Sequence, residues 1–342
     1  MHHRGVGFRP PWKHASHWFL SHGNNRAKCN TRSRRVRAFG NLRKLGLGLQ
    51  QVARGYLNHP MTRRAPLRIA RNMIGWQLRA RLAPGDHEEQ WIGGTRLLVR
   101  RGMTGATGNV YYGLAEFHDM AFVLHLLRAE ELFVDVGANI GSYSILAAGA
   151  CGAHVVAIEP IRSTQDKLKA NLSLNNLHTR VEVFEVCVGD HAGSVQMTRD
   201  SDTTNRVVSQ EEMSDVSHVE VPMRTLDQIL EGRCPVLMKI DTEGYEGNVL
   251  VGSERTLQSP SLLGLSIEGD GSKNYPSLGG LTIADWMRKF SFVPISYDGF
   301  TRTLSTNPVA YPMGNLLFVR NLDECRQRLM SARALRVLGI EV

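Results

Sequence analysis

The sequence predicts an α/β protein built on a mostly parallel sheet with helices on both faces. Short apolar runs that end in acidic residues alternate with segments of helical periodicity, which is typical of repeated strand–helix units. The stretch 132–160, LFVDVGANIGSYSILAAGACGAHVVAIEP, contains one such unit: strand, glycine turn, helix and second strand. At 342 residues the chain is long enough for a domain of about 200 to 250 residues and an N-terminal extension.

The first 110 residues are expected to form a basic N-terminal extension. Residues 1–35 are rich in His, Arg, Asn, Gly and Ser without a sustained period, which predicts a disordered tail; an Arg-rich organelle transit peptide is the alternative. Residues 36–110 are predicted to contain a helix at 66–82 and a short hairpin at 90–101 closed by a Gly-Gly turn. The helix, which carries arginines among its apolar residues, suits either an acidic lipid surface or packing on the chain's own domain.

The main α/β domain is expected at 111–322, followed by a C-terminal helix within 323–342. The expected strands are 132–136, 155–158, 181–188, 236–240, 262–267, 292–296 and 315–320. The expected helices are 114–127, 142–150, 163–175, 281–289 and 323–338. Residues 193–223, with clustered Ser, Asp, Thr and Val, are predicted to be an insertion of loops and antiparallel strands.

Charge is distributed unevenly along the chain. The sequence has 41 Lys and Arg against 32 Asp and Glu, a net charge of +9. No acidic residue precedes Asp86, so residues 1–85 carry +18, while the remainder, with 23 basic and 32 acidic residues, carries −9. A segment with this much positive charge favours an anionic partner, either a membrane surface or nucleic acid.

Cysteine usage and hydropathy indicate a cytoplasmic protein. The five cysteines are scattered, odd in number and without a CxxC pair, which argues against a disulfide framework and a zinc site. They are Cys29, Cys151, Cys187, Cys234 and Cys325. No apolar run approaches 18 residues, so no membrane-spanning helix is expected, although peripheral membrane association stays open.

The glycine turn at 137–141 is typical of a βαβ unit that binds an adenosine-containing cofactor. Gly137 and Gly141 bracket the turn, and Asn139 stands where a dinucleotide site has the glycine that admits a pyrophosphate. A side chain there favours a ligand without phosphates, of which S-adenosylmethionine is the common one. Glu159 ends the next strand 22 residues after Gly137, close to the spacing at which an acid meets ribose hydroxyls. A tight turn followed by a solvated strand-end acid is the structural alternative.

Acidic residues follow almost every expected strand. Because ligands bind beyond the carboxyl ends of parallel strands, these acids are expected around one cleft. They are Asp135, Glu159, Asp190, Asp241 with Glu243, and Glu268. An acidic cleft favours a cationic sulfonium ligand, and an acceptor hydroxyl needs a base. No spacing diagnostic of metal ligands is present, so no metal site is assigned, and dependence on Mg²⁺ stays open.

The segment MKIDTEGYEGNVLVGS at 238–253 carries the second informative pattern. Lys239 lies within an apolar strand, and Asp241 and Glu243 follow on the loop. Carboxylates this close together suit a general base; alternatively, Lys239 and Asp241 are an ion pair that secures the strand end, and Glu243 caps the next helix. The residues after Asp241 lack the Pro-Pro-aromatic pattern of adenine amino methylases, which favours an oxygen as the acceptor.

From about residue 112 to 320 the sequence resembles the FkbM family of S-adenosylmethionine-dependent methyltransferases. The matching motifs are YYGLAEFHDMAF at 111–122, FVDVGANIGSYS at 133–144, EP at 159–160, LKANLSLNN at 168–176, VGD at 188–190, TLDQIL at 225–230, MKIDTEGYE at 238–246 and GNLLFVR at 314–320. The resemblance implies a Rossmann-like class I methyltransferase fold with a seven-stranded sheet. It also implies O-methylation of a hydroxyl on a sugar, glycolipid or polyketide-type metabolite.

The resemblance also implies roles for individual residues. Those expected around the cofactor are Glu116 at its amino group, Asp135, Gly137, Asn139 and Gly141 at the methionyl part, Glu159 at the ribose, Val188, Gly189 and Asp190 at the adenine, and Asn171 as a buttress. Those expected to face the acceptor are Asp241, Glu243 and Glu268, with Asp241 favoured as the base. The alternative function is an RNA methyltransferase in which basic residues 1–85 bind phosphates. Of the two anionic partners considered for residues 1–85, a membrane surface is favoured over nucleic acid.

Overall fold

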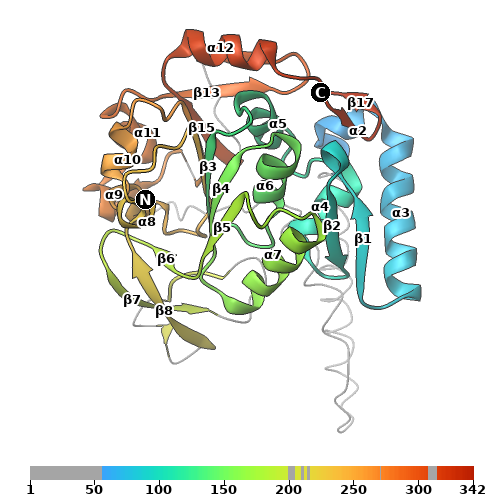
Figure 1. The fold of residues 1–342 in the computed structure, drawn as a ribbon, viewed down its shortest axis with the longest axis horizontal. Helices are drawn as coiled ribbons and strands as arrows, with labels where there is room; N and C mark the ends of the chain where they lie inside the picture. The colour runs from blue at the N-terminus through green and yellow to red at the C-terminus, as the bar shows by residue number, and fades with distance from the viewer. Residues whose placement is uncertain (1–55, 199–204, 209–211, 214–215, 270, 307–313) are drawn as a thin grey trace, which may run out of the picture.

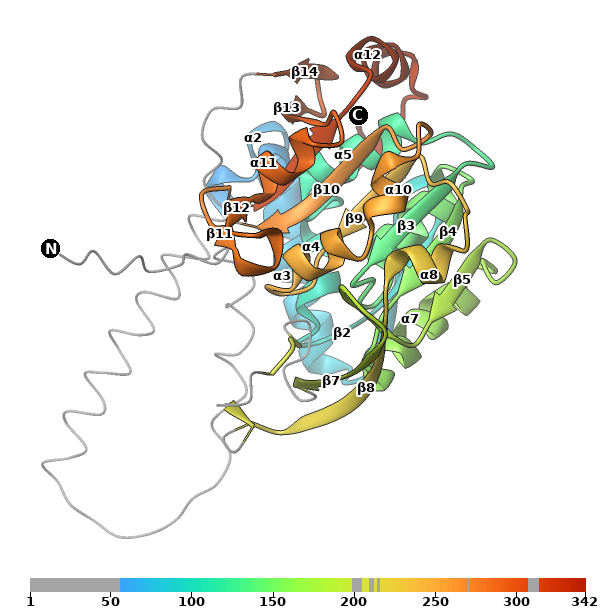
Figure 2. The ribbon, with the colours of Figure 1, turned by 90° about the vertical axis from the view of Figure 1, so that its left-hand side faces the viewer.

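The structure, a computed structural model, describes residues 56–198, 205–208, 212–213, 216–269, 271–306 and 314–342. The tail expected at 1–35 lies outside these residues. The described chain is organised around one central sheet, shown from two perpendicular directions in Figures 1 and 2.

The central sheet has the strand order β14-β13-β15-β10-β9-β3-β4-β5. Its strands are β3 Leu132–Val136, β4 His154–Ile158, β5 Val181–Phe184, β9 Leu237–Ile240, β10 Gly264–Gly269, β13 Val293–Asp298, β14 Thr303–Ser305 and β15 Gly314–Val319. The five strands from β10 to β5 are parallel, whereas β15 runs antiparallel between β10 and β13. The expected mostly parallel sheet is confirmed; β14 adds a short eighth strand to the expected seven.

Helices cover both faces of the sheet, as expected. Neighbouring strand residues point to opposite sides: Phe133 belongs to the core shared with one set of helices, and Val134 to the core shared with the other. The first set is α5 Phe117–Leu126, α6 Ser142–Ile145 with its π-helical continuation η3 Leu146–Ala150, α7 Arg162–Leu174 and α12 Leu322–Ser331. The second set, which faces the viewer in Figure 2, is α8 Leu226–Leu230, α9 Glu246–Val251, α10 Glu254–Gln258 and α11 Ile283–Arg288.

The N-terminal extension packs beside the first set of helices (Figure 1). Its elements are α2 Pro60–Arg64, α3 Pro66–Leu82, β1 Asp86–Gln90, β2 Arg96–Arg100 and α4 Thr104–Tyr112. The helix at 66–82 is therefore confirmed. The hairpin is present, but its first strand, β1, precedes the expected start at residue 90, and α4 was not expected. Asn171 of α7 ties this hairpin to the body, because its Oδ1 accepts the backbone N–H of Leu98 at 2.7 Å.

The insertion after β5 forms a separate sheet with the order β6-β8-β7. Its strands are β6 Cys187–Val188, β7 Gly193–Thr198 and β8 His218–Arg224, and β7 pairs with β8 antiparallel, as expected for 193–223. The strand expected at 181–188 is wrong as one element. It divides into β5, which completes the central sheet, and β6, which pairs with β8 instead.

The expected C-terminal helix is too long, because α12 ends at Ser331. The following residues form a hairpin of β16 Arg336–Val337 and β17 Ile340–Glu341. The two residues between these strands, Leu338 and Gly339, have φ of 48° and 75°. Positive φ at both central residues matches the twist of hairpin strands, and Gly339 adopts it without strain, so the chain turns here and does not continue the helix.

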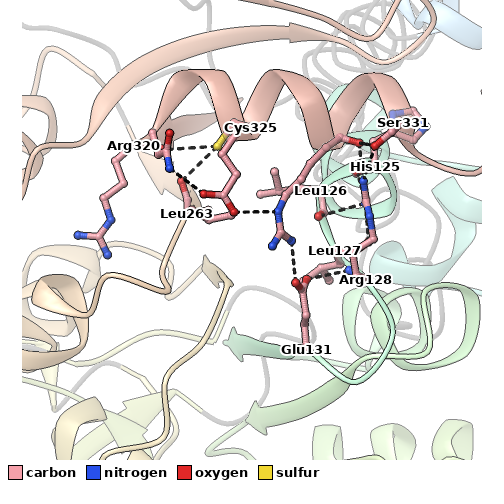
Figure 3. A network of polar contacts seen from close by, with 12 residues as sticks. His125, Leu126, Leu127, Arg128, Glu131, Leu263, Arg320, Cys325 and Ser331 are labelled. Atoms are coloured by element: carbon pink, nitrogen blue, oxygen red, sulfur yellow. Dashed lines mark hydrogen bonds and ion pairs between the residues drawn. The ribbon is translucent and has the colours of Figure 1, made fainter.

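Arg128 joins the end of α5 to α12 (Figure 3). Its guanidinium donates to the carbonyls of His125 and Leu127 at 2.8 and 3.0 Å, which satisfies carbonyl groups that have no helical partner at the end of α5. The same guanidinium donates to the carbonyl of Arg328 on α12 at 2.6 Å, and Arg328 pairs with Glu131 at 2.7 Å. These contacts fix α12 against the segment between α5 and β3.

The glycine turn between β3 and α6 is closely packed from two sides. Gly137 has φ of 78°, and a Cβ there would lie 1.8 Å from the carbonyl oxygen of Asp241. Gly141 has φ of 91°, and a Cβ there would lie 2.3 Å from Leu168 Cδ1. Both glycines are therefore required by backbone conformation and by space.

We expect Gly137→Ala to lower the free energy of unfolding by at least about 2 kcal/mol, because left-handed strain and the collision with Asp241 add together. Gly94→Ala is the matched control: Gly94 also has positive φ, at 86°, but nothing lies within 4 Å of its Cβ position. The control should lose only about 1 kcal/mol. Urea unfolding measures both, and equal losses would contradict close packing at Gly137.

Candidate active site

The register of the sheet aligns polar residues at the carboxyl ends of β3, β9 and β10. Asp135 lies opposite Lys239, and Lys239 lies opposite Ser266, so these three side chains point to the α5/α6 face. Two residues further along, Asp241 follows β9 and Glu268 lies opposite Asn315 of β15. Acids from distant parts of the sequence therefore meet at one edge of the sheet.

A pocket lies at this edge and encloses about 1100 Å³ of space not filled by atoms, part of it open to solvent. Eight residues predicted from the sequence line it: Glu116, Asp135, Gly137, Asn139, Glu159, Val188, Asp241 and Glu243. Its other walls include apolar and aromatic residues that the sequence did not single out, among them Tyr143, Ile158, Val186, Met197, Val207 and Tyr245. The small β6-β8-β7 sheet thus forms part of the wall.

Glu159, at the end of β4, is bound to the glycine turn. Its Oε2 accepts the backbone N–H of Asn139 and its Oε1 that of Ile161, both at 3.0 Å. Burial nevertheless raises the pKa of Glu159 to about 7. Asn139 itself has φ of 53°, a left-handed conformation that Asn tolerates better than most residues, so it can stand at this point of the turn.

Lys239 is a buried cation within a group of acids. Its Nζ lies 2.7 Å from Asp241 Oδ2, and its side chain is only 4% exposed. Burial alone would lower the pKa of Lys239, but the carboxylates of Asp241, Glu116 and Asp135 outweigh it and raise that pKa. Asp135 is also buried, which raises its pKa, and its Oδ2 accepts a hydrogen bond from Ser144 at 2.6 Å. The ion pair that the sequence left as an alternative for Lys239 and Asp241 is present.

A second acidic group, at the start of α5, meets these residues. Glu116 Oε2 accepts a hydrogen bond from the Tyr143 hydroxyl at 2.5 Å and from Asn315 Nδ2 at 3.1 Å. Asp119 lies one helical turn beyond Glu116, and burial together with the Glu116 carboxylate raises the pKa of Asp119 to about 8. The Lys239 Nζ also lies 4.7 Å from the centre of the Tyr143 ring. Sequence reasoning missed Asp119, Tyr143 and Asn315; the spacing of Asp119 from Glu116 was the available signal.

The three acids expected to face the acceptor lie together. One carboxylate oxygen from each of Asp241, Glu243 and Glu268 lies within 4.8 Å of the other two. This spacing would let the group share a proton or a divalent cation, but acids alone do not define a metal site. Glu243 does not cap the next helix, the alternative that the sequence left for it, because the N-cap of α9 is Tyr245 and no side chain caps this helix.

Four residues expected at the cofactor act from behind the pocket wall. Gly141 packs against Leu168, and Asn171 donates to the carbonyl of Ile140 at 3.0 Å, which supports the glycine turn. Gly189 packs against Met223, and the Asp190 carboxylate accepts a hydrogen bond from Asn248 at 3.1 Å. These four residues shape the wall without forming its surface.

The lining groups define what the pocket can bind. Carboxylates of Asp135, Glu159 and Asp241 face a space that also has apolar walls. Carboxylates attract a cationic ligand and accept hydrogen bonds from amines and hydroxyls, while the apolar residues suit a flat ring system.

Comparison with known proteins identifies the domain. Residues 135–292 match the family model described as the methyltransferase FkbM domain. Among solved structures, the chain is similar to a SAM-dependent methyltransferase from Agrobacterium tumefaciens, at 12% identity and a TM-score of 0.37, with 69% of this chain and 70% of that chain covered. It is also similar to an rRNA methylase from Streptococcus thermophilus, at 13% identity and a TM-score of 0.33, with coverage of 59% and 93%. No curated protein matches the chain.

We expect Lys239→Met to lower the free energy of unfolding by about 3 to 5 kcal/mol at pH 8, because it leaves buried carboxylates without their cation. The loss should shrink toward pH 5. The pKa of Asp135 is already raised by burial and rises further without Lys239, so the variant's native state binds protons that the unfolded state releases, and its stability increases as pH falls.

Lys169→Met is the control for this measurement. Lys169 forms an exposed pair with Glu185, so its loss should change stability by less than about 1 kcal/mol and without this pH trend. Denaturant unfolding at both pH values compares the two variants. A Lys239→Met loss no larger than that of the control would show that the cation does not hold the acids.

Proposed function

The chain carries an FkbM methyltransferase domain and uses S-adenosylmethionine, and we propose that it methylates a hydroxyl of a sugar, glycolipid or polyketide-type metabolite. An oxygen acceptor is supported by three neighbouring carboxylates, those of Asp241, Glu243 and Glu268. Asp241 and Glu243 also line the pocket. A hydroxyl must lose a proton when it is methylated, and a carboxylate group beside it can receive that proton.

The residues of the pocket fit the methyl donor. Acidic side chains near the glycine turn, Asp135 and Glu116, would hold the positively charged amino group, and Glu159 would accept from the ribose hydroxyls. Ile158, Val186 and Val188 would lie against the adenine. Bound S-adenosylmethionine supplies a methyl group on a positively charged sulfur, so the protein need not activate the leaving group.

Asp241 is proposed as the base that receives the acceptor's proton. Lys239 binds one of its oxygens and fixes the carboxylate at the pocket wall. Glu243 and Glu268 add negative charge within 4.8 Å, which favours holding a proton among the three acids. Orientation of the hydroxyl and removal of its proton are thus assigned to this protein's own side chains.

The proposed location is the cytoplasm, with a peripheral contact to a membrane. Four free cysteines among the described residues support a reducing compartment, and burial raises the pKa of Cys151, Cys187 and Cys325 to about 12, so they act as packing residues. None of the helices in the described part of the chain is long and apolar enough to span a bilayer.

We expect Glu159→Gln to weaken binding of S-adenosylmethionine by about 10- to 100-fold, since a charged acceptor for the ribose is lost. Affinity of the unchanged protein should rise as pH increases through about 7, where burial has placed the pKa of Glu159, because ionisation creates the acceptor. Calorimetry between about pH 6 and about pH 8 measures both effects. Glu182→Gln, an exposed acid on the neighbouring strand β5, is the control and should leave the pH profile unchanged. A profile for Glu159→Gln that matches the control would remove Glu159 from the ribose site.

We expect Asp241→Asn to lower turnover by about 10² or more while binding of S-adenosylmethionine persists, because the base is removed. Glu243→Gln and Glu268→Gln should cause smaller losses. The measurement uses labelled S-adenosylmethionine with a panel of glycans, lipid-linked sugars and RNA. Undiminished turnover in Asp241→Asn would leave Asp241 only the structural role of securing the strand end, and label on RNA would favour the alternative function.

A further inference from the structure

Helix α3 has apolar residues on two opposite faces. Ile69, Trp76 and Ala80 are buried against the body. Leu67, Ile74, Leu78 and Leu82 are 85%, 61%, 56% and 83% exposed. Each set repeats at intervals of seven and four residues, and the sets are offset by two residues, which is about 200° around a helix. The outer face therefore presents an apolar stripe about 22 Å long that the body does not cover.

This stripe concentrates the exposed apolar surface of the described chain. Of the seven large apolar side chains exposed among the described residues, five lie between Leu57 and Leu82; the other two are Val219 and Met330. Exposed apolar side chains gathered on one face indicate an interaction surface. Figure 1 shows α3 as the outermost labelled element on its side of the molecule.

The charges around the stripe select the partner. All six basic residues between 60 and 85 are exposed arginines, and no acidic residue precedes Asp86. Four of them, Arg68, Arg71, Arg79 and Arg81, lie on α3 itself. Arg63 and Arg64 lie on α2 just before it, where Arg64 stacks over the Phe300 ring. The nearest acids in sequence, on β1, are each paired with an arginine: Asp86 with Arg100, Glu88 with Arg96 and Glu89 with Arg79. A positive rim around an apolar face matches an anionic headgroup layer above acyl chains.

We propose that the outer face of α3 docks on an anionic lipid bilayer surface. The helix lies parallel to the membrane, with Leu67, Ile74, Leu78 and Leu82 inserted at the level where headgroups meet acyl chains and the arginines of α3 among the headgroups. Its inner face remains packed on the body through Trp76 and Ile69, so docking requires no unfolding. This surface is separate from the pocket, and it would hold the enzyme where lipid-linked acceptors are.

The test is flotation of the full chain with vesicles of phosphatidylcholine with and without phosphatidylglycerol. The unchanged protein should float with the anionic vesicles, and Ile74→Gln/Leu78→Gln should reduce the bound fraction at least about tenfold, since two inserted side chains become polar. Leu67→Gln/Leu82→Gln should give a similar loss. Met330→Gln, at an exposed methionine of α12, is the matched control and should float like the unchanged protein.

Two controls make the result decisive. All variants keep residues 1–55, so charge in that segment contributes equally to each. Binding of S-adenosylmethionine should be unchanged in every variant, which shows that the fold is intact and separates this proposal from the proposed methyl acceptor. Equal flotation of Ile74→Gln/Leu78→Gln and the control would overturn the proposal. So would a failure of the unchanged protein to float, or a dimer that the same substitutions dissociate without any vesicle binding.

Discussion

The acidic edge of the sheet depends on the buried ammonium group of Lys239. Asp135 lies in β3 and Asp241 follows β9, and their negative charges would repel one another, most strongly at Asp135, which is buried. Lys239 lies in β9, next to β3, and makes the carboxylates compatible with a folded state. The glycine turn is packed against the carbonyl of Asp241, so the placement of this cation also affects the cofactor side of the pocket.

The sequence predicted the sheet well because its strands are buried on both faces and appear as continuous apolar runs. It predicted the short helices poorly. Helix α4 contains four glycines or threonines in its first five positions and little apolar periodicity, and α8 and α10 have only five residues each. The end of α12 was misjudged because the apolar spacing continues past Ser331, whereas the turn at Leu338 and Gly339 decides the conformation.

Sequence reasoning found the site residues that lie at the ends of strands. It missed those that reach the site only through the pairing of distant strands. The strand-end rule located Asp135, Glu159 and Asp241, since each lies at the end of an apolar run. Asn315 reaches the site only because β15 runs antiparallel beside β10 and places it opposite Glu268. Pairing between strands so distant in sequence has no local signature, so no spacing in the chain could have indicated it.

The position of β15 has a consequence for how the chain reaches its folded state. This strand is the last of the sheet in sequence, yet it lies between β10 and β13, both made earlier. Until residues 314–319 have emerged during synthesis, β10 and β13 present unpaired backbone edges to solvent. Unpaired edges attract other chains, so the incomplete protein is expected to need protection from aggregation until β15 has been made and has inserted between β10 and β13.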